Sequence, residues 1–420
     1  MIQTIQLRPG ITLQCFPDER FKQGCLSLQM IRPMCREEAA LNALIPAVLL
    51  RGTQKAPDLR AITLRLDDLY GASVGALVRR VGDYQTTGLH CSFIDDRYAM
   101  EGDAVLAPMA EFLGELLLEP ALENGVFRDD YVQSEKKNLI STIESQRNDK
   151  RTYAAAQLLK RMCKEDSFGI PRLGETEQVQ AITAAAAYEH FTRILRESRI
   201  ELFYVGGACP ETVAQSLLPV MDRLDRDYVN LSGQTPFHST PGGDYRETMD
   251  VAQGRLNMGL VTPITIGDAR FAAMQVCNTI FGGGMTSKLF MNVREKLSLC
   301  YDIGSGYHGV KGIMTVSAGI DCKTEETTRK EILAQLEACK QGQITAEELN
   351  AAKQAVMSSL RAVHDAPGAI ENYYSTTALS GLGMTPAEYK EKVEQVTLEQ
   401  VTEAARSLTL HTTYFLEGVQ

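Results

Sequence analysis

Residues 281–301 read FGGGMTSKLFMNVREKLSLCY, and the first four letters mark a change of structure. An apolar run at 271–281 has helical spacing and ends at three consecutive glycines: Gly282, Gly283 and Gly284. Glycine commonly ends a helix because it adopts backbone conformations that other residues avoid. A second helix is therefore predicted to begin at about Thr286.

Arg294 and Tyr301 are the two residues of this stretch that could act on a ligand. They are seven positions apart, which is about two helical turns, so on one helix both side chains would project from about the same face. A guanidinium and a phenol aimed at one point can hold a carbonyl oxygen or a developing oxyanion. The alternative is a glycine-rich helix cap followed by a surface arginine and a half-buried tyrosine.

The composition indicates a globular protein with at least two domains. The chain has 420 residues, of which 44% are hydrophobic and 23% are charged. One ordinary hydrophobic core does not grow to this size. The net charge of −10 argues against a nucleic-acid partner, because phosphate binding needs a basic surface.

Neither a secretion signal nor a membrane span is predicted. The longest near-continuous apolar run, residues 41–50, contains Asn42 and Pro46 and is too short to cross a bilayer. The start, MIQTIQLRPG, lacks the basic and apolar regions of a signal peptide. The ten cysteines form no CxxC pair, which is typical of reduced thiols. We therefore expect a cytoplasmic protein without membrane contacts.

An α+β pattern runs through the first half of the chain. Alternating apolar residues predict strands, in chain order at 11–15, 25–31, 73–81, 86–94 and 201–207. The third and fourth of these form a predicted hairpin that turns at Gly82-Asp83. Helical spacing predicts helices, in chain order at 37–53, 58–69, 101–118, 124–164 and 210–224.

The second half repeats this order. Strands are predicted at 245–250 and 255–261, a hairpin at 305–321, and helices at 268–281, 324–339 and 345–363. Both hairpins follow a tyrosine and end in Ile-Asp, and short landmarks recur: VQAIT at 179–183 as VEQVT at 393–397, and FYVGG at 203–207 as YFLEG at 414–418. Several landmarks in one order indicate a duplicated α+β domain.

The junction between the halves is LSGQTPFHSTPGG, residues 231–243. This segment is rich in Ser, Thr, Gly and Pro and has no periodicity, so it is predicted to be a linker. The predicted organisation is an N-terminal domain at 1–230, the linker at 231–243, and a C-terminal domain at 244–420.

The duplicated halves, with GGG–S–LF–VRE–x4–Y opening the second, resemble the M16 peptidase family (insulinase, pitrilysin and mitochondrial processing peptidase) over essentially the whole chain. The resemblance implies two homologous M16/LuxS-like domains, each an antiparallel-rich mixed sheet with helices packed on one face. In active members the first half carries HxxEH, two zinc ligands and a general base, and a later helix adds a carboxylate ligand. The second half supplies an Arg and a Tyr that contact the peptide, which here fall on Arg294 and Tyr301.

The same resemblance places the zinc and base positions on residues that cannot fill them. Counting back from the Gly-Thr step that ends the family helix puts the two histidine positions at Ala43 and Ala47, and the base at Pro46. The later Glu-x6-Glu pattern falls on EKKNLIST, which keeps Glu135 but puts Thr142 at the ligand position.

The histidines lead to the same interpretation without the family. The chain has six of them, and no two are within ten residues of each other: His90, His190, His238, His308, His364 and His411. A helical HxxxH pair is therefore impossible. Alanine and proline neither bind zinc nor carry a proton, and hydrolysis without an activated water and a base loses its main source of rate. We expect no bound metal and no catalytic residue on this chain alone.

The resemblance then implies a catalytically silent subunit of a heterodimeric zinc peptidase. Arg294 would hold a peptide carbonyl, Tyr301 would donate to the oxyanion, and the glycines would let the backbone approach the peptide or let the loop flex. A partner M16 chain with HxxEH would carry the zinc, and the peptide would add as a strand to a sheet edge. The alternatives are a non-enzymatic structural or peptide-binding scaffold, similar to the core subunits of the respiratory bc1 complex, and an unrelated α+β protein.

Overall fold

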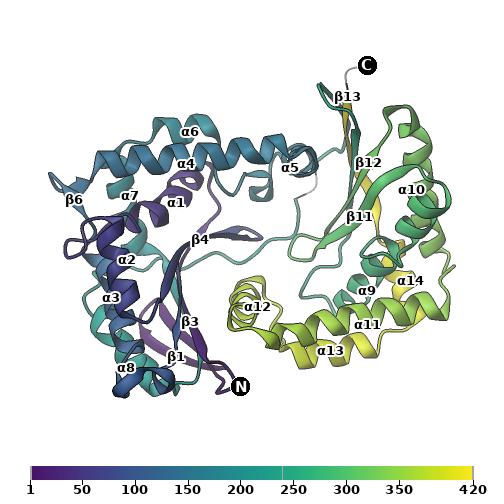
Figure 1. Ribbon diagram of the computed structural model, residues 1–420. Helices are drawn as coiled ribbons and strands as arrows, with labels where there is room; N and C mark the ends of the chain where they lie inside the picture. The colour runs from purple at the N-terminus through teal and green to yellow at the C-terminus, as the bar shows by residue number, and fades with distance from the viewer. Residues whose placement is uncertain (1, 239, 419–420) are drawn as a thin grey trace. The chain divides into compact units, whose positions relative to one another are not determined.

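The computed structural model describes residues 2–238 and 240–418, which form two compact units (Figure 1). Unit 1 contains the chain up to Glu144 together with Ile170–Gly233 and His364–Leu379. Unit 2 contains Ser145–Gly169, Gln234–Val363 and the chain from Ser380 onward. Each unit therefore includes one segment that the sequence places in the other half.

Unit 1 is built on a six-stranded mixed sheet of order β1-β2-β8-β3-β5-β4. Its strands are β1 (Gln3–Arg8), β2 (Ile11–Pro17), β3 (Gln23–Pro33), β4 (Ser73–Val81), β5 (Tyr84–Ile94) and β8 (Arg199–Gly206). β2 and β8 are parallel, and every other neighbouring pair is antiparallel. The predicted β4–β5 hairpin is confirmed, and Gly82 takes the left-handed conformation (φ 57°) that its turn requires.

Unit 2 repeats five of these strands in the same order. Its sheet, β11-β12-β10-β13-β9, is made of β9 (Asp244–Met249), β10 (Gly254–Val261), β11 (Cys300–His308), β12 (Ile313–Ile320) and β13 (Thr409–Gly418). The parallel pair β9–β13 corresponds to β2–β8, and the remaining pairs are antiparallel as in unit 1. The shared order and strand directions confirm the predicted duplicated α+β fold.

Most helices of unit 1 cover one face of its sheet. They are α1 (Arg36–Leu49), α2 (Leu59–Asp68), α3 (Leu106–Leu118), α6 (Thr176–Ala181), α7 (Ala184–Glu197) and α8 (Pro210–Met221). Alternate residues of β3 enter the core on this face, where Leu26 and Leu28 are fully buried with Leu44 of α1 and Leu113 of α3. The period-2 pattern of the strand thus selects which side of the sheet the helices cover.

Unit 2 has a matching helical layer. It comprises α9 (Phe271–Phe281), α10 (Glu325–Lys340), α11 (Ala346–Ala362), α13 (Pro386–Glu394) and α14 (Leu398–Arg406). α9 is apolar on nearly every side, because it contacts β11 as well as α10, α11, α13 and α14. α11 begins with a capping box between Thr345 and Glu348, with hydrogen bonds of 2.8 and 3.1 Å.

The helix predicted at 124–164 is wrong as a single element. A short hairpin, β6 (Leu122–Glu123) and β7 (Val126–Phe127), comes first, followed by α4 (Asp129–Asn148) and α5 (Lys150–Met162). The helix is interrupted at Asp149, which has an extended backbone (ψ 97°) and accepts hydrogen bonds from the backbone N–H groups of Arg151 and Thr152. One capping residue ends one helix and starts the next, so the helical spacing on both sides hides the break.

The exchanged helices are α5, from the first half of the sequence, and α12 (Pro367–Ser380), from the second. α5 belongs to unit 2, where it contacts β10, β12 and β13. α12 belongs to unit 1, where Glu371 reaches Ser27 of β3 and Arg79 of β4. Each helix contacts the sheet face opposite the main helical layer: α12 meets Ser27 of β3, which alternates with the core residues Leu26 and Leu28, and α5 lies against Gly259 of β10.

Candidate functional site

Arg294 lies on a π-helix, η4 (Leu289–Lys296), which follows the glycine loop of unit 2. Leu289 and Val293 of this helix are fully buried and anchor it in the core. The Arg294 side chain is 40% exposed, its Nη1 lies 3.6 Å from the Glu295 carboxylate, and its Cζ lies 4.6 Å from the centroid of the Phe290 ring. The arginine therefore stacks on its own helix while its charge stays available to solvent. π-Helices are rare and occur often at functional sites.

Tyr301 is not on this helix, so the prediction that one helix carries both residues is wrong. The helix ends at Lys296, and Ser298 takes a left-handed conformation (φ 51°) that reverses the chain. The Leu299 N–H then donates to the Val293 carbonyl at 3.0 Å, and Tyr301 is the second residue of strand β11. A seven-residue spacing predicts a shared face only while the helix continues, and here it stops first.

A β-bulge sets the position of Tyr301. Cys300 pairs with Ile320 and Asp302 pairs with Gly319, so Tyr301 is the extra residue between two consecutive pairs. A bulged residue is left out of the ladder and its side chain is re-aimed, which agrees with the 62% exposure of Tyr301.

Arg294 acts electrostatically on the start of the same strand. Burial and the charge of Asp302 raise the pKa of the Cys300 thiol to about 11, and the charge of Arg294 opposes that increase. The cation and the phenol therefore come from the two sides of one reverse turn, the end of η4 and the start of β11.

The three glycines differ in what they do. A side chain at Gly282 would begin 2.7 Å from the Ser305 hydroxyl, and the Gly282 carbonyl accepts a hydrogen bond from the Ser305 N–H at 2.9 Å. A side chain at Gly283 would begin 2.7 Å from the Cα of Thr279. Gly284 is exposed and has open space around it. Gly282 is buried and serves internal packing, whereas Gly283 and Gly284 are exposed, and Gly283 lies close to the backbone of the preceding helix.

Apolar side chains surround this turn in the sequence. Four large hydrophobic residues between positions 285 and 301 are exposed: Met285, Met291, Leu297 and Tyr301. Exposed apolar side chains scattered singly are ordinary, but a local concentration beside a cation is typical of a binding surface.

The positions to which the sequence resemblance assigns the zinc ligands and the base lie in unit 1 and carry no suitable side chains. Ala43 and Pro46 are buried on α1, and Ala47 is half-buried there. Thr142 is exposed on α4, and its hydroxyl donates to the Asn138 carbonyl at 2.9 Å. Across residues 2–238 and 240–418, no group of three or more His, Cys, Asp or Glu could hold a metal ion. The residues present do not fit a zinc ion.

Glu135, the acidic residue that remains of that pattern, faces a cation of the chain itself. Its carboxylate lies 3.2 Å from Nη1 of Arg51 and accepts a hydrogen bond from Asn138 at 3.1 Å. Arg51 also lies over the Tyr131 ring, with its Cζ 5.3 Å from the centroid. This ion pair ties the end of α1 to α4.

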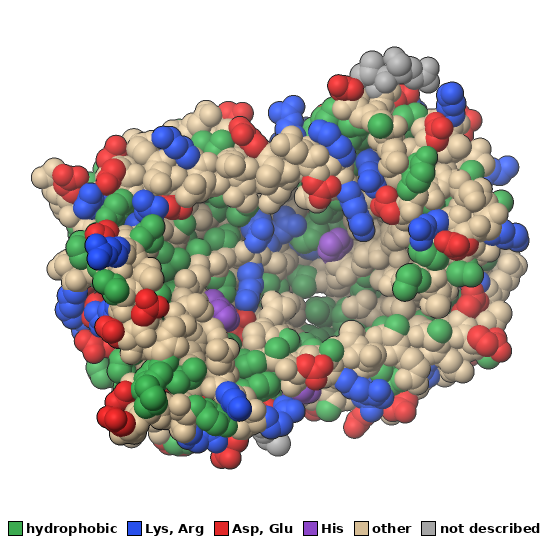
Figure 2. All heavy atoms as spheres, viewed as in Figure 1, with side chains coloured by type: hydrophobic (Ala, Val, Ile, Leu, Met, Phe, Trp, Pro, Cys, Tyr) green, Lys and Arg blue, Asp and Glu red, His purple; other side chains and the backbone are tan. Residues whose placement is uncertain are grey.

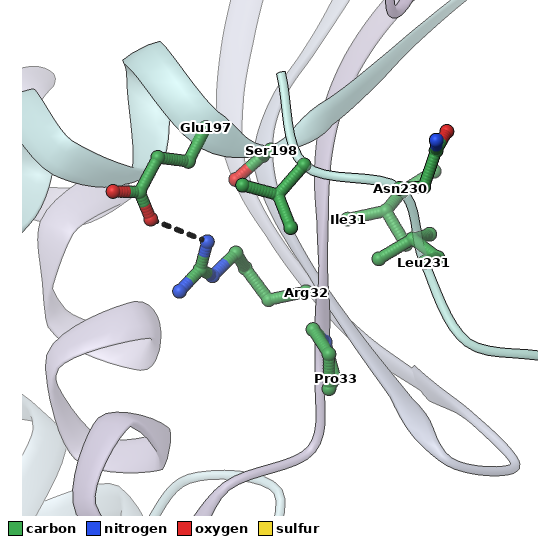
Figure 3. A pocket seen from close by; sticks show the side chains of 8 residues that line it. Ile31, Arg32, Pro33, Glu197, Ser198, Asn230 and Leu231 are labelled. Carbon is green, nitrogen blue, oxygen red and sulfur yellow. Dashed lines mark hydrogen bonds and ion pairs between the residues drawn. The ribbon is translucent and has the colours of Figure 1, made fainter. Parts of the chain in front are cut away.

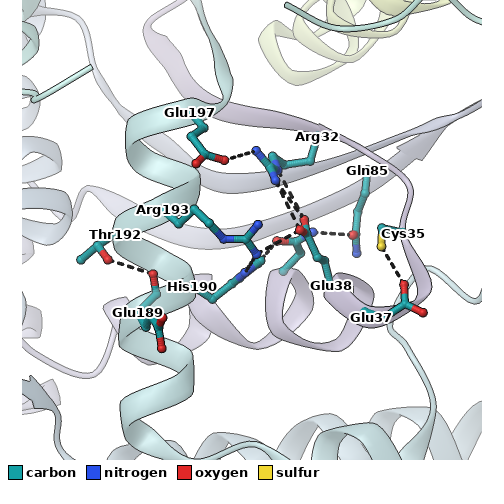
Figure 4. Close-up of polar contacts among 11 residues, drawn as sticks. Arg32, Cys35, Glu37, Glu38, Gln85, Glu189, His190, Thr192, Arg193 and Glu197 are labelled. Carbon is teal, nitrogen blue, oxygen red and sulfur yellow. Dashed lines mark hydrogen bonds and ion pairs between the residues drawn. The ribbon is translucent and has the colours of Figure 1, made fainter. Parts of the chain in front are cut away.

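His190 is the most buried of the described histidines that could have suggested acid–base chemistry, and its contacts are structural (Figure 4). Its Nδ1 accepts from Arg193 at 2.8 Å, so Nε2 carries the proton and donates to Asn42 at 2.7 Å. Burial lowers the pKa of His190 to about 4, with Glu38 opposing the shift. The neutral ring is buried and joins α7 to α1.

A small cavity of about 150 Å³ lies between β3 and the chain that follows α8 (Figure 3). The charged side chains of its lining are paired with each other or with a neighbour, because Arg32 bonds Glu197 at 3.2 Å and Glu38 at 3.3 Å, whereas the buried Ser198 hydroxyl has no hydrogen-bond partner. The cavity is too small for a peptide, so the exposed turn at Arg294 and Tyr301 is the better candidate.

The net charge of −10 is unfavourable for a polyanionic partner. Figure 2 shows acidic as well as basic side chains on the visible face. A nucleic-acid surface needs a continuous basic stripe or patch. Among the helices of the described chain, none combines the length and apolarity needed to span a bilayer.

Comparisons with known proteins agree on one family. Residues 181–356 match the family model described as the peptidase M16 inactive domain. The chain is 30% identical over 411 residues to a Bacillus subtilis (strain 168) protein named "Probable inactive metalloprotease YmfF". This match covers 98% of this chain and 96% of that protein.

Solved structures extend the likeness to the whole fold. A conserved protein from Enterococcus faecalis V583 is 28% identical, with a TM-score of 0.91 and coverage of 100% of this chain and 99% of that one. A peptidase M16 inactive domain from Pseudomonas fluorescens, 18% identical, has a TM-score of 0.82 and coverage of 100% and 98%. The latter shows a shared fold.

Proposed function

This chain belongs to the M16 peptidase family as an inactive member, and we propose that it is the silent subunit of a two-chain zinc peptidase that processes peptides. A partner chain of the same family with an HxxEH motif would supply the zinc, the activated water and the general base. This chain would supply Arg294 and Tyr301 to the bound peptide.

The observation that carries the proposal is an asymmetry between the two halves. In the first half, Ala43, Pro46 and Ala47 leave no polar side chain where the family binds zinc. In the second half, Arg294 is 40% exposed and Tyr301 is 62% exposed at one turn. An exposed cation and an exposed phenol on one turn are not needed for folding, and this favours a role in binding a ligand.

Peptide chemistry suits this turn. The guanidinium of Arg294 is a charged donor for a peptide carbonyl, and the hydroxyl of Tyr301 is a neutral donor for an oxyanion. The exposed methionines beside them, Met285 and Met291, can accept apolar side chains of varied shape because methionine is flexible and polarisable.

Extended peptides can add to a free sheet edge, and β4 is the outer strand of the first sheet. Arg172 donates to the Val78 carbonyl, and Arg80 donates to the Ile170 carbonyl. The loop at 170–172 therefore covers the end of β4. At the start of the strand, Gly75 is exposed and has open space around it, so this stretch stays uncovered.

The cytoplasm is the compartment that we propose. All ten cysteines are free thiols, and seven of them are buried. Reducing conditions maintain such thiols, whereas secreted proteins more often use disulfides.

The test combines metal analysis with peptidase assays. The purified chain is assayed alone and mixed with an HxxEH-bearing paralogue from the same genome. We expect the chain alone to be metal-free and inert and the mixture to cleave peptides. Arg294→Ala should lower kcat/KM of the mixture by roughly 10- to 100-fold, as expected for a lost charged hydrogen bond. Tyr301→Phe should lower it by about 5-fold.

Lys296→Ala is the matched control, because this exposed cation lies on the same π-helix two residues away. It should leave kcat/KM unchanged. Stoichiometric zinc and cleavage by the chain alone would show that the assignment of Ala43, Pro46, Ala47 and Thr142 is wrong. Inactivity of every mixture would favour the scaffold alternative, in which Arg294 and Tyr301 are dispensable.

A further inference from the structure

An ion pair crosses the second sheet next to Tyr301. Arg255 of β10, Gly319 of β12 and Asp302 of β11 are in register on three adjacent strands. Nη1 of Arg255 donates to both carboxylate oxygens of Asp302, at 2.6 and 2.9 Å. Because β12 lies between the two charged residues, the pair spans that strand.

Gly319 makes this crossing possible. A side chain there would begin 2.4 Å from Oδ1 of Asp302 and 2.6 Å from Nη1 of Arg255. A Cβ atom does not approach other heavy atoms this closely, so any larger residue would displace the ion pair. The glycine is required for space, since its backbone is not in the left-handed region.

The exchanged helix α5 extends the network. Nε of Arg151, in the first turn of α5, lies 4.0 Å from Oδ2 of Asp302. Asp149, which caps α5, has a pKa lowered chiefly by its hydrogen bond from Thr152, with a smaller contribution from the charge of Arg255. Acidic and basic groups therefore alternate from the start of α5 to the bulge.

The bulge needs such a restraint, because a bulged strand can shift its register by one residue. If Tyr301 took the place opposite Gly319, Asp302 would move opposite Ala318, which is fully buried, and would face the other side of the sheet. A charge would then enter the apolar core, which is costly. In the observed register the same charge meets Arg255.

We propose that Asp302 is a positioning residue for Tyr301: its ion pair with Arg255 across Gly319 holds the bulge that presents the phenol to a peptide. The presentation to a peptide rests on the proposed function. The restraint on Tyr301 does not, because it follows from the strand register and the charges alone.

The experiment reads Tyr301 directly, without partner or peptide. Fluorotyrosine is placed at position 301 of the full chain, and its 19F resonance is recorded in solution. We expect one narrow resonance in the parent chain and in Arg255→Lys, which keeps a cation. Asp302→Asn and Gly319→Ala should each give a shifted or second resonance. Glu326→Gln, an exposed acidic residue on α10, is the control and should match the parent.

A second measurement uses kcat/KM of the mixture with the HxxEH paralogue. Asp302→Asn should lower it by about as much as Tyr301→Phe, and the double variant should lose no more than either single variant, because both act through one hydroxyl. Arg255→Lys should retain most of the activity. A residue that merely supports the fold would instead give losses that multiply.

The outcomes separate the two proposals. An unchanged resonance in both Asp302→Asn and Gly319→Ala overturns the positioning role, whatever the assays show. A changed resonance with no peptide effect of Tyr301→Phe supports the positioning role and overturns the peptide contact. If Asp302→Asn does not fold, Gly319→Ala decides, because its methyl group displaces the ion pair while both charges remain.

Discussion

The exchanged helices α12 and α5 have corresponding places in their units but are held by different chemistry. α12 brings Glu371 onto the first sheet, where its fully buried carboxylate accepts hydrogen bonds from Ser27 (2.7 Å) and Gln29 (2.9 Å) of β3. Arg79 of β4 completes the site with two bonds, at 3.0 and 2.8 Å. The contact is a buried, bidentate ion pair within a polar network.

α5 meets the second sheet with apolar side chains instead. Ala154 and Leu158 pack against Tyr414 and Leu416 of β13, and all four are buried. The charged contact lies at the margin of this cluster, where the partly exposed Glu247 of β9 bonds Arg161.

The same position of the fold can therefore be held by a buried ion pair or by apolar packing, and the two contacts should differ in how much stability a single substitution removes. An apolar contact weakens in proportion to the atoms removed from it. A buried ion pair that loses one member leaves an uncompensated charge, and the cost is far greater than the net value of the pair. We therefore expect the α12 contact to be the more fragile of the two under single substitutions.

Breaking the ion pair should have the largest effect. Arg79→Met leaves the Glu371 carboxylate buried without its cation, and we expect a loss of about 4 kcal/mol in the free energy of unfolding of unit 1. Denaturant unfolding measures the loss, and amide hydrogen exchange at 367–380 localises it to α12. Adding Glu371→Gln to Arg79→Met should restore most of the stability. Unchanged amide protection of α12 in Arg79→Met would contradict the comparison.

Truncating the apolar contact should have a smaller effect. Leu158→Ala removes a buried side chain of α5, and we expect a loss of about 3 kcal/mol from the lost burial and the cavity left behind. Hydrogen exchange at 150–162 should rise while 367–380 stays protected. Ala156→Gln, at an exposed position of the same helix, should change stability by less than about 0.5 kcal/mol. Equal losses from both variants would refute site-specific packing.

Lowering the pH should destabilise unit 1 more than unit 2. We expect this to be the smallest of the three effects on the free energy of unfolding. Burial is the main reason that the pKa of His190 in unit 1 falls from 6.5 to about 4. Between these values the unfolded chain binds a proton that the folded chain does not, so stability falls as the pH falls. At pH 5 this protonation of the unfolded chain should lower the free energy of unfolding by about 2 kcal/mol. Unfolding curves from pH 7 to 4.5 measure it.

The His190→Gln variant provides the control for the acid experiment. Glutamine does not titrate, so the variant should lack the part of the pH dependence that His190 contributes. Hydrogen exchange should show α7 of unit 1 losing protection at a higher pH than α9 of unit 2. A pH profile of His190→Gln identical to that of the parent chain would assign the acid sensitivity to other groups.

Local patterns were sufficient for most of the secondary structure and failed at identifiable points. The alternation along 25–31 and the helical spacing at 271–281 correspond to β3 and α9, because each pattern is complete within one element. The single helix predicted at 124–164 missed the break at Asp149, since one capping residue leaves the spacing on both sides intact. Tyr301 was predicted to lie on a helix because the left-handed turn occurs at Ser298, where the sequence has no glycine that would indicate the end of the helix.

What the sequence by itself determined was the duplicated α+β order and the absence of an HxxxH pair of histidines. Both depend on residue identity and on neighbours along the chain, and Ala43 or Pro46 cannot coordinate a metal in any conformation. Only the tertiary structure decided which sheet each exchanged helix covers, the bulge at Tyr301, and the pairing of Asp302 with Arg255. These features depend on contacts between residues 47 positions apart, as in that pair, or 344 apart, as between Ser27 and Glu371. Local periodicity carries no information about such distant partners, because chain folding alone brings them together.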